Sequence, residues 1–208
     1  KGYTSNPLVY CGCLGVLPAS KKSSKPLKAT PGDAIVAIGG RTGRDGLRGA
    51  TFSSLEMDTS TTDIASASVQ IGNPITEKQV QEVILKARDE NLYSAMTDCG
   101  AGGFSSAVGE MASELGAMVK LENIKTKYPG LHPWELWLSE AQERMVLAVP
   151  KENVFRLEEL CTSQDVELTV LGEFTDTGRL ELSYQEKLVG QLGLDFLHEG
   201  IPRKTLKA

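Results

Sequence analysis

The sequence predicts an α/β domain of the α+β type, in which helices cover a mixed, mostly antiparallel β-sheet. Two observations support this fold class. Stretches with strand and helix periodicity alternate through the first part of the chain, and strand-like stretches cluster near its end. The length of 208 residues suits one compact domain, and we therefore expect residues 1–208 to form a single domain.

The first strands and loops follow from turn residues and short apolar runs. We expect exposed loops at residues 20–31, which are polar, basic and interrupted by Pro, and at residues 54–66, which are rich in Ser, Thr and Asp. Short strands are expected around these loops, at Leu8–Val16, Ala34–Ile38 and Ala67–Ile71.

Two longer helices are predicted in the middle of the chain. A Thr-x-x-Gln capping box followed by apolar residues on one helical face predicts a helix over about Thr76–Asn91. After a strand at Tyr93–Thr97, a second helix should cover about Ser105–Leu115, and Gly116 should end it.

The remaining elements alternate and then become strands only. A short helix, a strand, a helix and three strands are expected at Trp134–Leu138, Arg144–Val149, Glu152–Ser163, Glu167–Gly172, Arg179–Tyr184 and Lys187–Leu192. Asp176–Gly178 has the composition of a tight turn, because Gly accepts a positive φ.

Composition and charge argue against several classes of protein. Hydrophobic residues make up 40% and charged residues 24% of the chain, as in ordinary globular proteins. The formal net charge of -5 and the lack of clustered aromatic residues disfavour a nucleic-acid partner. No apolar run reaches the ~18 residues of a membrane span, and no signal peptide is visible. We therefore expect a cytoplasmic protein with no membrane partner.

Cysteine and histidine residues do not form a recognisable metal or catalytic motif. Cys11 and Cys13 have no second pair at the spacing of a zinc site, so the cysteines are expected to be small hydrophobic residues. His132 and His198 are isolated and have no Ser or Cys partner at a recognisable spacing. We accordingly assign no catalytic residue within this chain.

A glycine-rich stretch at Gly39–Gly46 is the first candidate for an anion site. Glycines let the backbone approach an anion closely, and Arg41 and Arg44 could pair with phosphate oxygens. The stretch has neither the Gly-Lys-Ser/Thr ending of a Walker A loop nor the spacing of a dinucleotide fingerprint. Composition supports a glycine-rich hairpin with solvated arginines equally well.

A second candidate is the turn that follows the strand ending near Thr97. Asp98 would stand at the end of this strand, where a carboxylate can hold Mg²⁺. Gly100, Gly102 and Gly103 precede a helix, whose N-terminal N–H groups favour phosphate. The alternative is that Asp98 only caps the turn. We favour the functional reading, because so many glycines otherwise reduce stability.

A third candidate is the polar string Ser139–Arg144, between two apolar segments. Its side chains could hydrogen-bond a substrate, or Glu143 could form an internal salt bridge with Arg144 or with their neighbours, and composition does not decide between these. Gln70 ends a predicted strand, a position where a lone Gln is usually structural.

These strings together resemble the synthetase portion of phosphoribosylformylglycinamidine synthases. The similar stretches are GGRTGRDGLRGATFSS, SVQIGNPITE, TDCGAGGFSSAVGE, SEAQERM, LGEFTDTGRL and LDFL. The resemblance covers nearly the whole chain and implies the C-terminal domain of an aminoimidazole-ribonucleotide-synthetase-like unit. The implied reaction uses ATP to phosphorylate the formamide oxygen of formylglycinamide ribonucleotide, after which ammonia displaces phosphate to give the amidine.

The resemblance also implies roles for particular residues. Asp98 would bind Mg²⁺, and Gln70 together with Glu140, Ala141 and Gln142 would contact the ribonucleotide. The family commonly has SESQER where this chain has SEAQER, so a hydroxyl is missing at Ala141. Loss of that contact would weaken binding by about 1 kcal/mol.

The resemblance further implies that other parts complete the enzyme. A preceding N-terminal synthetase domain, which supplies most ATP contacts, and a second synthetase unit lie outside these residues, and a glutaminase domain or subunit supplies ammonia. We therefore expect the chain alone to make no product, and its partner-facing surface leaves self-association as a homo-oligomer open.

Two rival readings remain. One is a domain of another ATP-dependent synthetase of the same superfamily, which the GAGGFSSAVGE and SEAQER strings disfavour. The other is a non-catalytic binding or scaffold domain, in which the glycine loops are merely structural.

Overall fold

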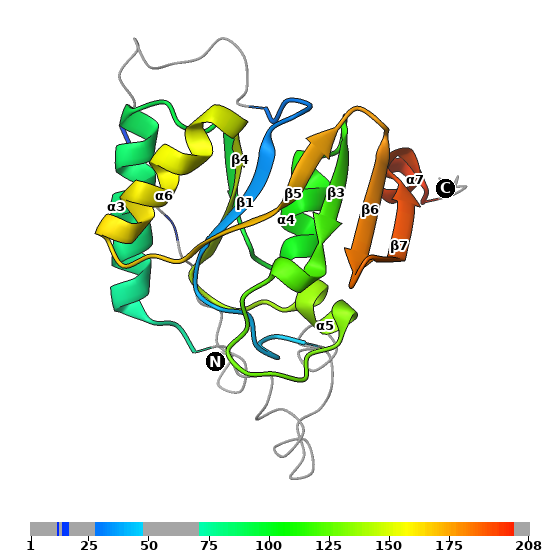
Figure 1. The fold of residues 1–208 in the computed structure, drawn as a ribbon, viewed down its shortest axis with the longest axis horizontal. Coiled ribbons are helices and arrows are strands. Elements are labelled where there is room, and N and C mark those ends of the chain that lie inside the picture. The colour runs from blue at the N-terminus through cyan, green and yellow to red at the C-terminus, as the bar shows by residue number, and fades with distance from the viewer. Residues whose placement is uncertain (1–11, 13, 17–27, 48–70, 202–208) are drawn as a thin grey trace, which may run out of the picture.

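The computed structural model of the chain describes residues 12, 14–16, 28–47 and 71–201. In this part the predicted fold class is confirmed, since helices pack on both faces of a seven-stranded mixed sheet (Figure 1). The strand order is β2-β4-β1-β5-β3-β6-β7. Every neighbouring pair is antiparallel except β3 and β6, which are parallel. No helix in these residues is long and apolar enough to cross a bilayer.

The strands occupy ranges close to those expected from the sequence. They are β1 Ala34–Gly39, β2 Ala95–Asp98, β3 Gly116–Lys120, β4 Arg144–Val149, β5 Leu168–Thr175, β6 Arg179–Tyr184 and β7 Lys187–Gly193. The helices are α3 Pro74–Asp89, α4 Phe104–Met111, α5 Pro133–Leu138, α6 Val154–Ser163 and α7 Leu194–Glu199. Short 3₁₀ turns, η3 Leu121–Asn123 and η4 Lys151–Asn153, complete the described elements.

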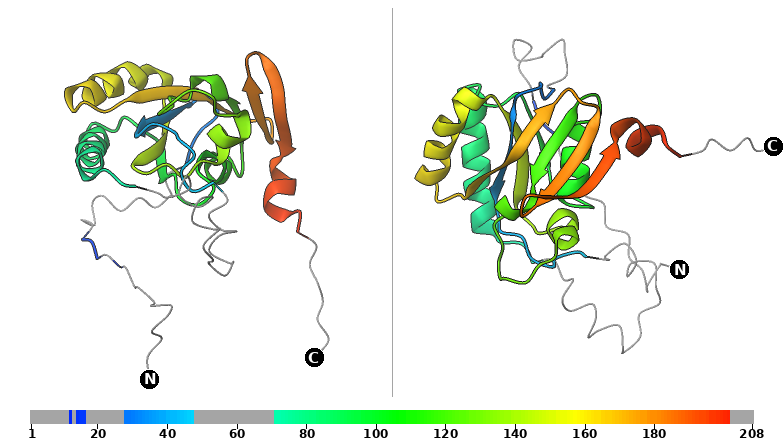
Figure 2. Two further views of the ribbon diagram at one scale, coloured as in Figure 1. Left: turned by 90° about the horizontal axis from the view of Figure 1, so that it is seen from below. Right: turned by 45° about the vertical axis from the view of Figure 1, so that its right-hand side comes forward.

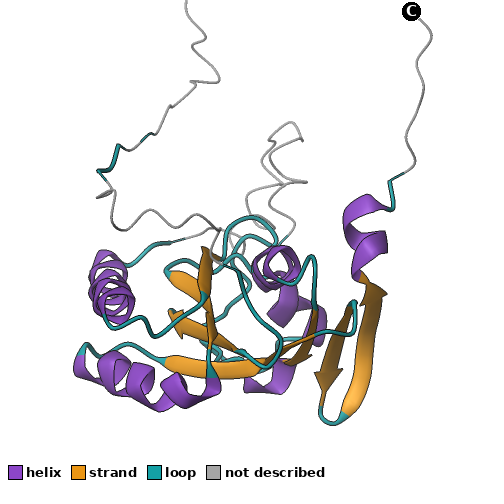
Figure 3. Ribbon diagram, turned by 90° about the horizontal axis from the view of Figure 1, so that it is seen from above, coloured by secondary structure: helices purple, strands orange, loops and turns teal. Residues whose placement is uncertain are grey.

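Alternation along the central strands creates two separate cores, because successive side chains of a strand point to opposite faces. On one face of β1, Val36 packs with buried residues of α3 and α6. On the other face, Ile35 packs with buried residues of α4, α5 and the strands β3 to β6. Figure 3 shows α3 and α6 together at one side of the sheet, and α7 beyond its far edge.

The sheet face on the α6 side is not covered along its whole width by the described helices. A groove of about 630 Å³ follows β5, β3 and β6. Met118, Val170 and Leu188 line it and are 42%, 38% and 60% exposed. In the second view of Figure 2 these strands run beside α6 toward the β6–β7 hairpin and the projecting α7.

Helix α3 begins earlier than the capping box predicted. Asn73 is its N-cap, with a side chain that accepts a hydrogen bond from the N–H of Ile75 at 3.1 Å. Pro74 follows at the first helical position, where its fixed φ suits the helix and its missing N–H is no loss. The predicted cap at Thr76 is therefore wrong, since a better cap lies three residues before it.

Strand β3, the short turn η3 and helix α7 were not predicted, and a glycine lies at the start of β3 and of α7. Gly116 ends no helix but begins β3, where a Cβ would overlap the hydroxyl of Thr175 on β5. Helix α4 ends at Met111, before the predicted end at Leu115, and no element was predicted for residues 117–120. Helix α7 begins after Gly193 with only six residues, too few to show a helical period.

Other expectations lie outside the described residues. These are most of the strand over Leu8–Val16, most of the loop at 20–31, the whole loop at 54–66, and the strand over Ala67–Ile71 apart from Ile71. Residues 12, 14–16 and 71 are described, and none of them is in a strand, so the strand prediction is wrong there. The expected turn at Asp176–Gly178 is confirmed, with Gly178 at φ 67°.

Candidate functional site

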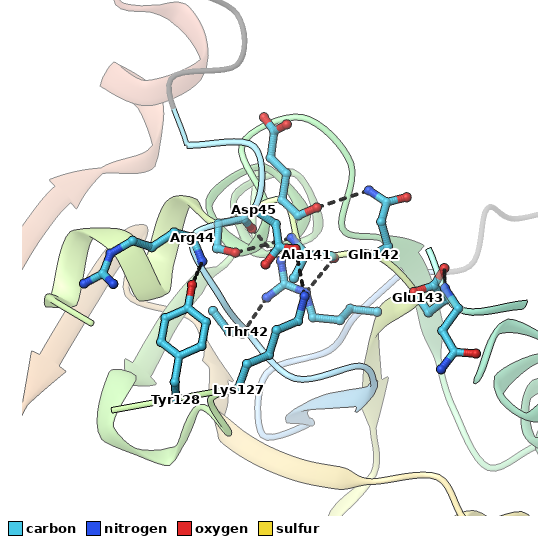
Figure 4. Close-up of polar contacts among 12 residues, drawn as sticks. Thr42, Arg44, Asp45, Lys127, Tyr128, Ala141, Gln142 and Glu143 are labelled. Atoms are coloured by element: carbon cyan, nitrogen blue, oxygen red, sulfur yellow. Dashed lines mark hydrogen bonds and ion pairs between the residues drawn. The ribbon is translucent and has the colours of Figure 1, made fainter. Parts of the chain in front are cut away.

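The segment Ser139–Arg144 is the place where the three candidate strings of the sequence meet. Figure 4 shows its contacts with the segment that carries Thr42 and Asp45. The backbone N–H of Gly40 donates to the carbonyl of Glu143 at 3.0 Å. The N–H of Gly102 donates to the carboxylate of Glu140, also at 3.0 Å. The N–H of Glu140 in turn donates to the carbonyl of Asp45 at 2.8 Å. Segments nearly 100 residues apart in the chain thus form one polar cluster.

Arg144 lies beneath this cluster and is only 4% exposed. Its Nε donates to the carbonyl of Ala141 at 3.0 Å, one Nη donates to Thr42 Oγ1 at 2.8 Å, and the other donates to the carbonyl of Ser139. The guanidinium also lies 4.3 Å from the centre of the Phe104 ring. Burial lowers the pKa of Arg144 from its ordinary value, yet an arginine remains charged in proteins.

Close backbone contacts explain the glycines of two strings. Gly103 has a φ of 57°, and a Cβ on it would overlap the carbonyl oxygen of Ser139. Gly39 has a φ of 104°, and a Cβ there would overlap the carbonyl oxygen of Glu143. Both positions therefore require glycine for conformation and for space. Glu143 itself has a φ of 57°, a strained value for a side chain of this size.

Asp98 ends β2 and is exposed, as expected for a carboxylate at a strand end. A Cβ on Gly100 would lie 3.1 Å from its Oδ2, so the carboxylate faces the glycine turn. The described residues contain no group of three or more His, Cys, Asp or Glu side chains arranged for a metal. A single carboxylate still fits Mg²⁺, which commonly binds one or two carboxylates together with substrate phosphates and water.

The glycine turn is held by its own backbone and by Glu140. The N–H of Gly103 donates to the carbonyl of Gly100 at 2.9 Å, while the N–H of Gly102 has the Glu140 carboxylate as its acceptor. No side chain caps the N-terminus of α4. A phosphate at Gly102 would compete with Glu140 for the same N–H, so anion binding and the position of Glu140 are linked.

The two arginines that were candidates for phosphate binding, Arg41 and Arg44, both have carboxylate partners. Arg41 makes a bidentate pair with Glu167, with N–O distances of 2.5 to 3.1 Å. Arg44 binds Glu135 at 2.8 Å and donates to the carbonyl of Gly130. Hydrogen bonds from these arginines lower the pKa of Glu167 and of Glu135. Phosphate contacts by either arginine remain a prediction.

The residues expected to contact the ribonucleotide lie at different depths. Ala141 is 1% exposed, and its N–H donates to Ser139 Oγ at 3.3 Å. Glu140 and Gln142 are partly exposed, and Gln142 Nε2 donates to the carbonyl of Glu140 at 3.2 Å. Gln70 lies outside the described residues.

Glu143 and Arg144 do not form the alternative ion pair, since each side chain has other partners. Glu143 instead accepts the N–H of Asn73 at 2.9 Å, and the guanidinium of Arg144 binds neutral oxygens. Within the described part of the chain these two side chains form no ion pair with each other.

Sequence reasoning missed several residues that build the cluster. Thr42 is 1% exposed and accepts from Arg144, while Asp45 is 8% exposed and accepts from Lys127 Nζ at 2.7 Å. Tyr128 accepts the N–H of Arg44 at 2.8 Å. Asp45 is a charged residue inside a glycine-rich stretch, which was a signal that it has a special role. Its partner Lys127 is distant in the sequence and could not be predicted.

Comparison with known proteins places this geometry in a family. Residues 30–185 match the family described as AIR synthase related protein, C-terminal domain. The chain is 37% identical over 202 residues to the phosphoribosylformylglycinamidine synthase subunit PurL of Thermoplasma acidophilum, and equally identical to that of Methanopyrus kandleri. These matches cover 96% of this chain but only 26% and 28% of the two relatives. The chain thus spans about a quarter of the length of these relatives.

Solved structures give the same placement. The structure of PurL from T. maritima complexed with FGAR has a TM-score of 0.74 and 33% identity, covering 87% of this chain and 31% of that one. The complex of that protein with ATP has a TM-score of 0.69 and 30% identity, covering 81% and 26%. A HypE–HypF complex, at a TM-score of 0.56 and 17% identity over 80% of this chain and 55% of that one, shares the fold alone.

Replacing Gly103 by Ala should lower the free energy of unfolding by about 3 kcal/mol, because the new methyl meets the Ser139 carbonyl and a positive φ. Urea denaturation measures this change. Gly130→Ala is the matched control, since Gly130 has a φ of 89° and no atom within 4 Å of a built Cβ. It should lose only about 1 to 2 kcal/mol. Equal losses would contradict the close contact at Gly103.

The pair of Arg44 and Glu135 should make stability depend on pH. The hydrogen bond from Arg44, opposed by burial, keeps the pKa of Glu135 below its ordinary value of 4.5. The stabilisation is therefore complete above that value and is lost as pH falls through the folded-state pKa. Glu135→Gln should be about 1 kcal/mol less stable at pH 7, and the difference should shrink in acid. A difference that stays constant down to pH 3 would contradict the ion pair.

Proposed function

The chain belongs to the family of AIR synthase related C-terminal domains, and on this basis we propose that it is the substrate- and magnesium-binding domain of a phosphoribosylformylglycinamidine synthase. Its reaction is the ATP-dependent amidation of formylglycinamide ribonucleotide in purine synthesis. The observation that carries the proposal is the meeting of Gly39–Gly40, Gly100–Gly103 and Ser139–Glu143 in one polar cluster. A T. maritima relative of the same fold has been solved with FGAR and with ATP.

Each polar group of the cluster has a role in this proposal. Asp98 holds Mg²⁺, which supplies charge neutralisation for ATP phosphates. The glycine turn at Gly100–Gly103 lets an anionic oxygen approach the backbone closely, because no Cβ blocks it. Glu140 and Gln142 orient the ribonucleotide by hydrogen bonds, and Gln70 contributes a further contact. Holding the reactants in line supplies most of the catalysis of a phosphoryl transfer.

The rest of the enzyme provides what this domain does not. The chain spans about a quarter of its curated relatives, 26% of the T. acidophilum protein. We propose that a synthetase domain outside these residues supplies most ATP contacts, and that a glutaminase supplies ammonia. A PurLQS assembly from T. maritima, whose matched chain has a TM-score of 0.70, supports a multi-subunit setting.

The rival functions are less well supported. A scaffold domain needs no carboxylate exposed beside a glycine turn, but Asp98 has that place. Another synthetase of the superfamily is disfavoured by identity, since the HypE–HypF complex shares 17% of its sequence with this chain, whereas PurL of T. maritima shares 33%.

The metal role of Asp98 predicts a specific spectroscopic change. Mn²⁺, which accepts the same oxygen ligands as Mg²⁺, should broaden the amide NMR signals of residues 98–102 through its unpaired electrons. In Asp98→Asn the same broadening should need at least about tenfold more Mn²⁺, because the charged ligand is gone.

Asp176→Asn is the matched control for this titration. Asp176 is an exposed carboxylate in the β5–β6 turn, and β5 ends beside Ala34, at the opposite end of β1 from Gly39 and the cluster. The control should broaden as the wild-type chain does. Broadening in Asp98→Asn at the wild-type Mn²⁺ concentration would refute the metal assignment.

A further inference from the structure

We propose that Arg144 is a positioning residue, which fixes Glu140 and Gln142 in the orientation that binds substrate. The effect on substrate binding rests on the proposed function. The fixed position of Glu140 and Gln142 does not, because it is a property of this chain. The Arg144 side chain is almost absent from the molecular surface, since the residue is only 4% exposed. It must therefore act on any ligand through the residues that it holds.

The geometry of the guanidinium is suited to this task. It binds the carbonyl oxygens of Ser139 and Ala141, the residues on either side of Glu140. The Ser139–Glu140 and Ala141–Gln142 peptide planes are thus tied to one rigid, planar group. The N–H of Glu140 is separately bound to the carbonyl of Asp45. With its backbone fixed, the Glu140 carboxylate reaches the N–H of Gly102 at 3.0 Å.

The same side chain joins the other two strings to this segment. Its remaining Nη binds Thr42, which follows the glycines of β1, and its plane lies over Phe104, the first residue of α4. Two of the strings, and the first residue of the helix that follows the third, therefore contact one guanidinium. A shift of Arg144 would change the spacing between Glu140 and the glycine turn.

A purely structural role does not require a cation at this place. A buried charge without a carboxylate partner is unfavourable compared with an apolar side chain of similar volume. Asp45, an acidic residue whose charge is felt at Arg144, is bound to Lys127 at 2.7 Å. What arginine provides and methionine does not is a planar set of donors directed at three oxygens.

Hydrogen exchange of backbone amides in the ligand-free chain tests the positioning directly. In Arg144→Lys, which keeps the charge but loses the planar fork, the amides of Gly102, Glu140 and Ala141 should exchange at least about tenfold faster. The amides of Val36 and Leu147 in the central strands should keep their rates. Unchanged exchange at the first set, or an equal increase in both, would overturn the proposal.

Two further variants keep the test decisive. Arg156→Lys changes an exposed arginine that pairs with Glu90 and Glu159, and it should leave the amides of the cluster unaffected. Thr42→Val removes one acceptor of the guanidinium without changing side-chain volume much, and should accelerate exchange at Ala141 even if Arg144→Lys fails to fold. If the Ala141 amide of Thr42→Val exchanges at the same rate as in the wild-type chain, the proposal is wrong.

Ligand affinity separates this inference from the proposed function. Formylglycinamide ribonucleotide should bind Arg144→Lys at least about tenfold more weakly than it binds Arg156→Lys. If the wild-type chain binds none of this ligand, the proposed function fails, while the exchange rates still decide the positioning. If exchange accelerates but affinity is equal, Arg144 does not position the substrate residues and the inference fails alone.

Discussion

A single buried guanidinium, that of Arg144, joins the parts of the chain on which the candidate site depends. It binds the backbone on both sides of Glu140, reaches Thr42 and lies over Phe104. These contacts come from segments that are distant in sequence, so the cluster exists only when the sheet has formed. Its carbonyl and hydroxyl partners satisfy hydrogen bonds without cancelling the charge, which leaves the surroundings favourable for a nearby anion.

Close approach of the backbone is the second constraint. The chain at Ser139 and Glu143 passes so near to Gly103 and Gly39 that no side chain would fit at either glycine. The glycine-rich strings therefore serve two purposes at once. They permit the contact that closes the cluster, and they form a turn beside an exposed carboxylate, Asp98, on which the proposed Mg²⁺ role rests.

Local patterns predicted most of the fold. Strands β4 and β6, for example, have the predicted ranges, because the residues that indicate each strand are adjacent in the sequence. Prediction failed where the signal was tertiary. Strand β3 begins at a glycine that fits against Thr175, and the burial of Arg144 depends on oxygens from two distant segments. For the site, the three strings were found by composition and resemblance, but their mutual contacts were not, since nothing in the sequence states which strand lies beside which.

The most direct test of the central claim is an amide chemical-shift map of the chain titrated with formylglycinamide ribonucleotide. The account predicts that the shifts concentrate at Gly102, Glu140 and Gln142 and that they saturate. No saturable shifts there, or shifts centred instead on Met118 and Val170 in the sheet groove, would contradict the assignment of the polar cluster as the substrate site.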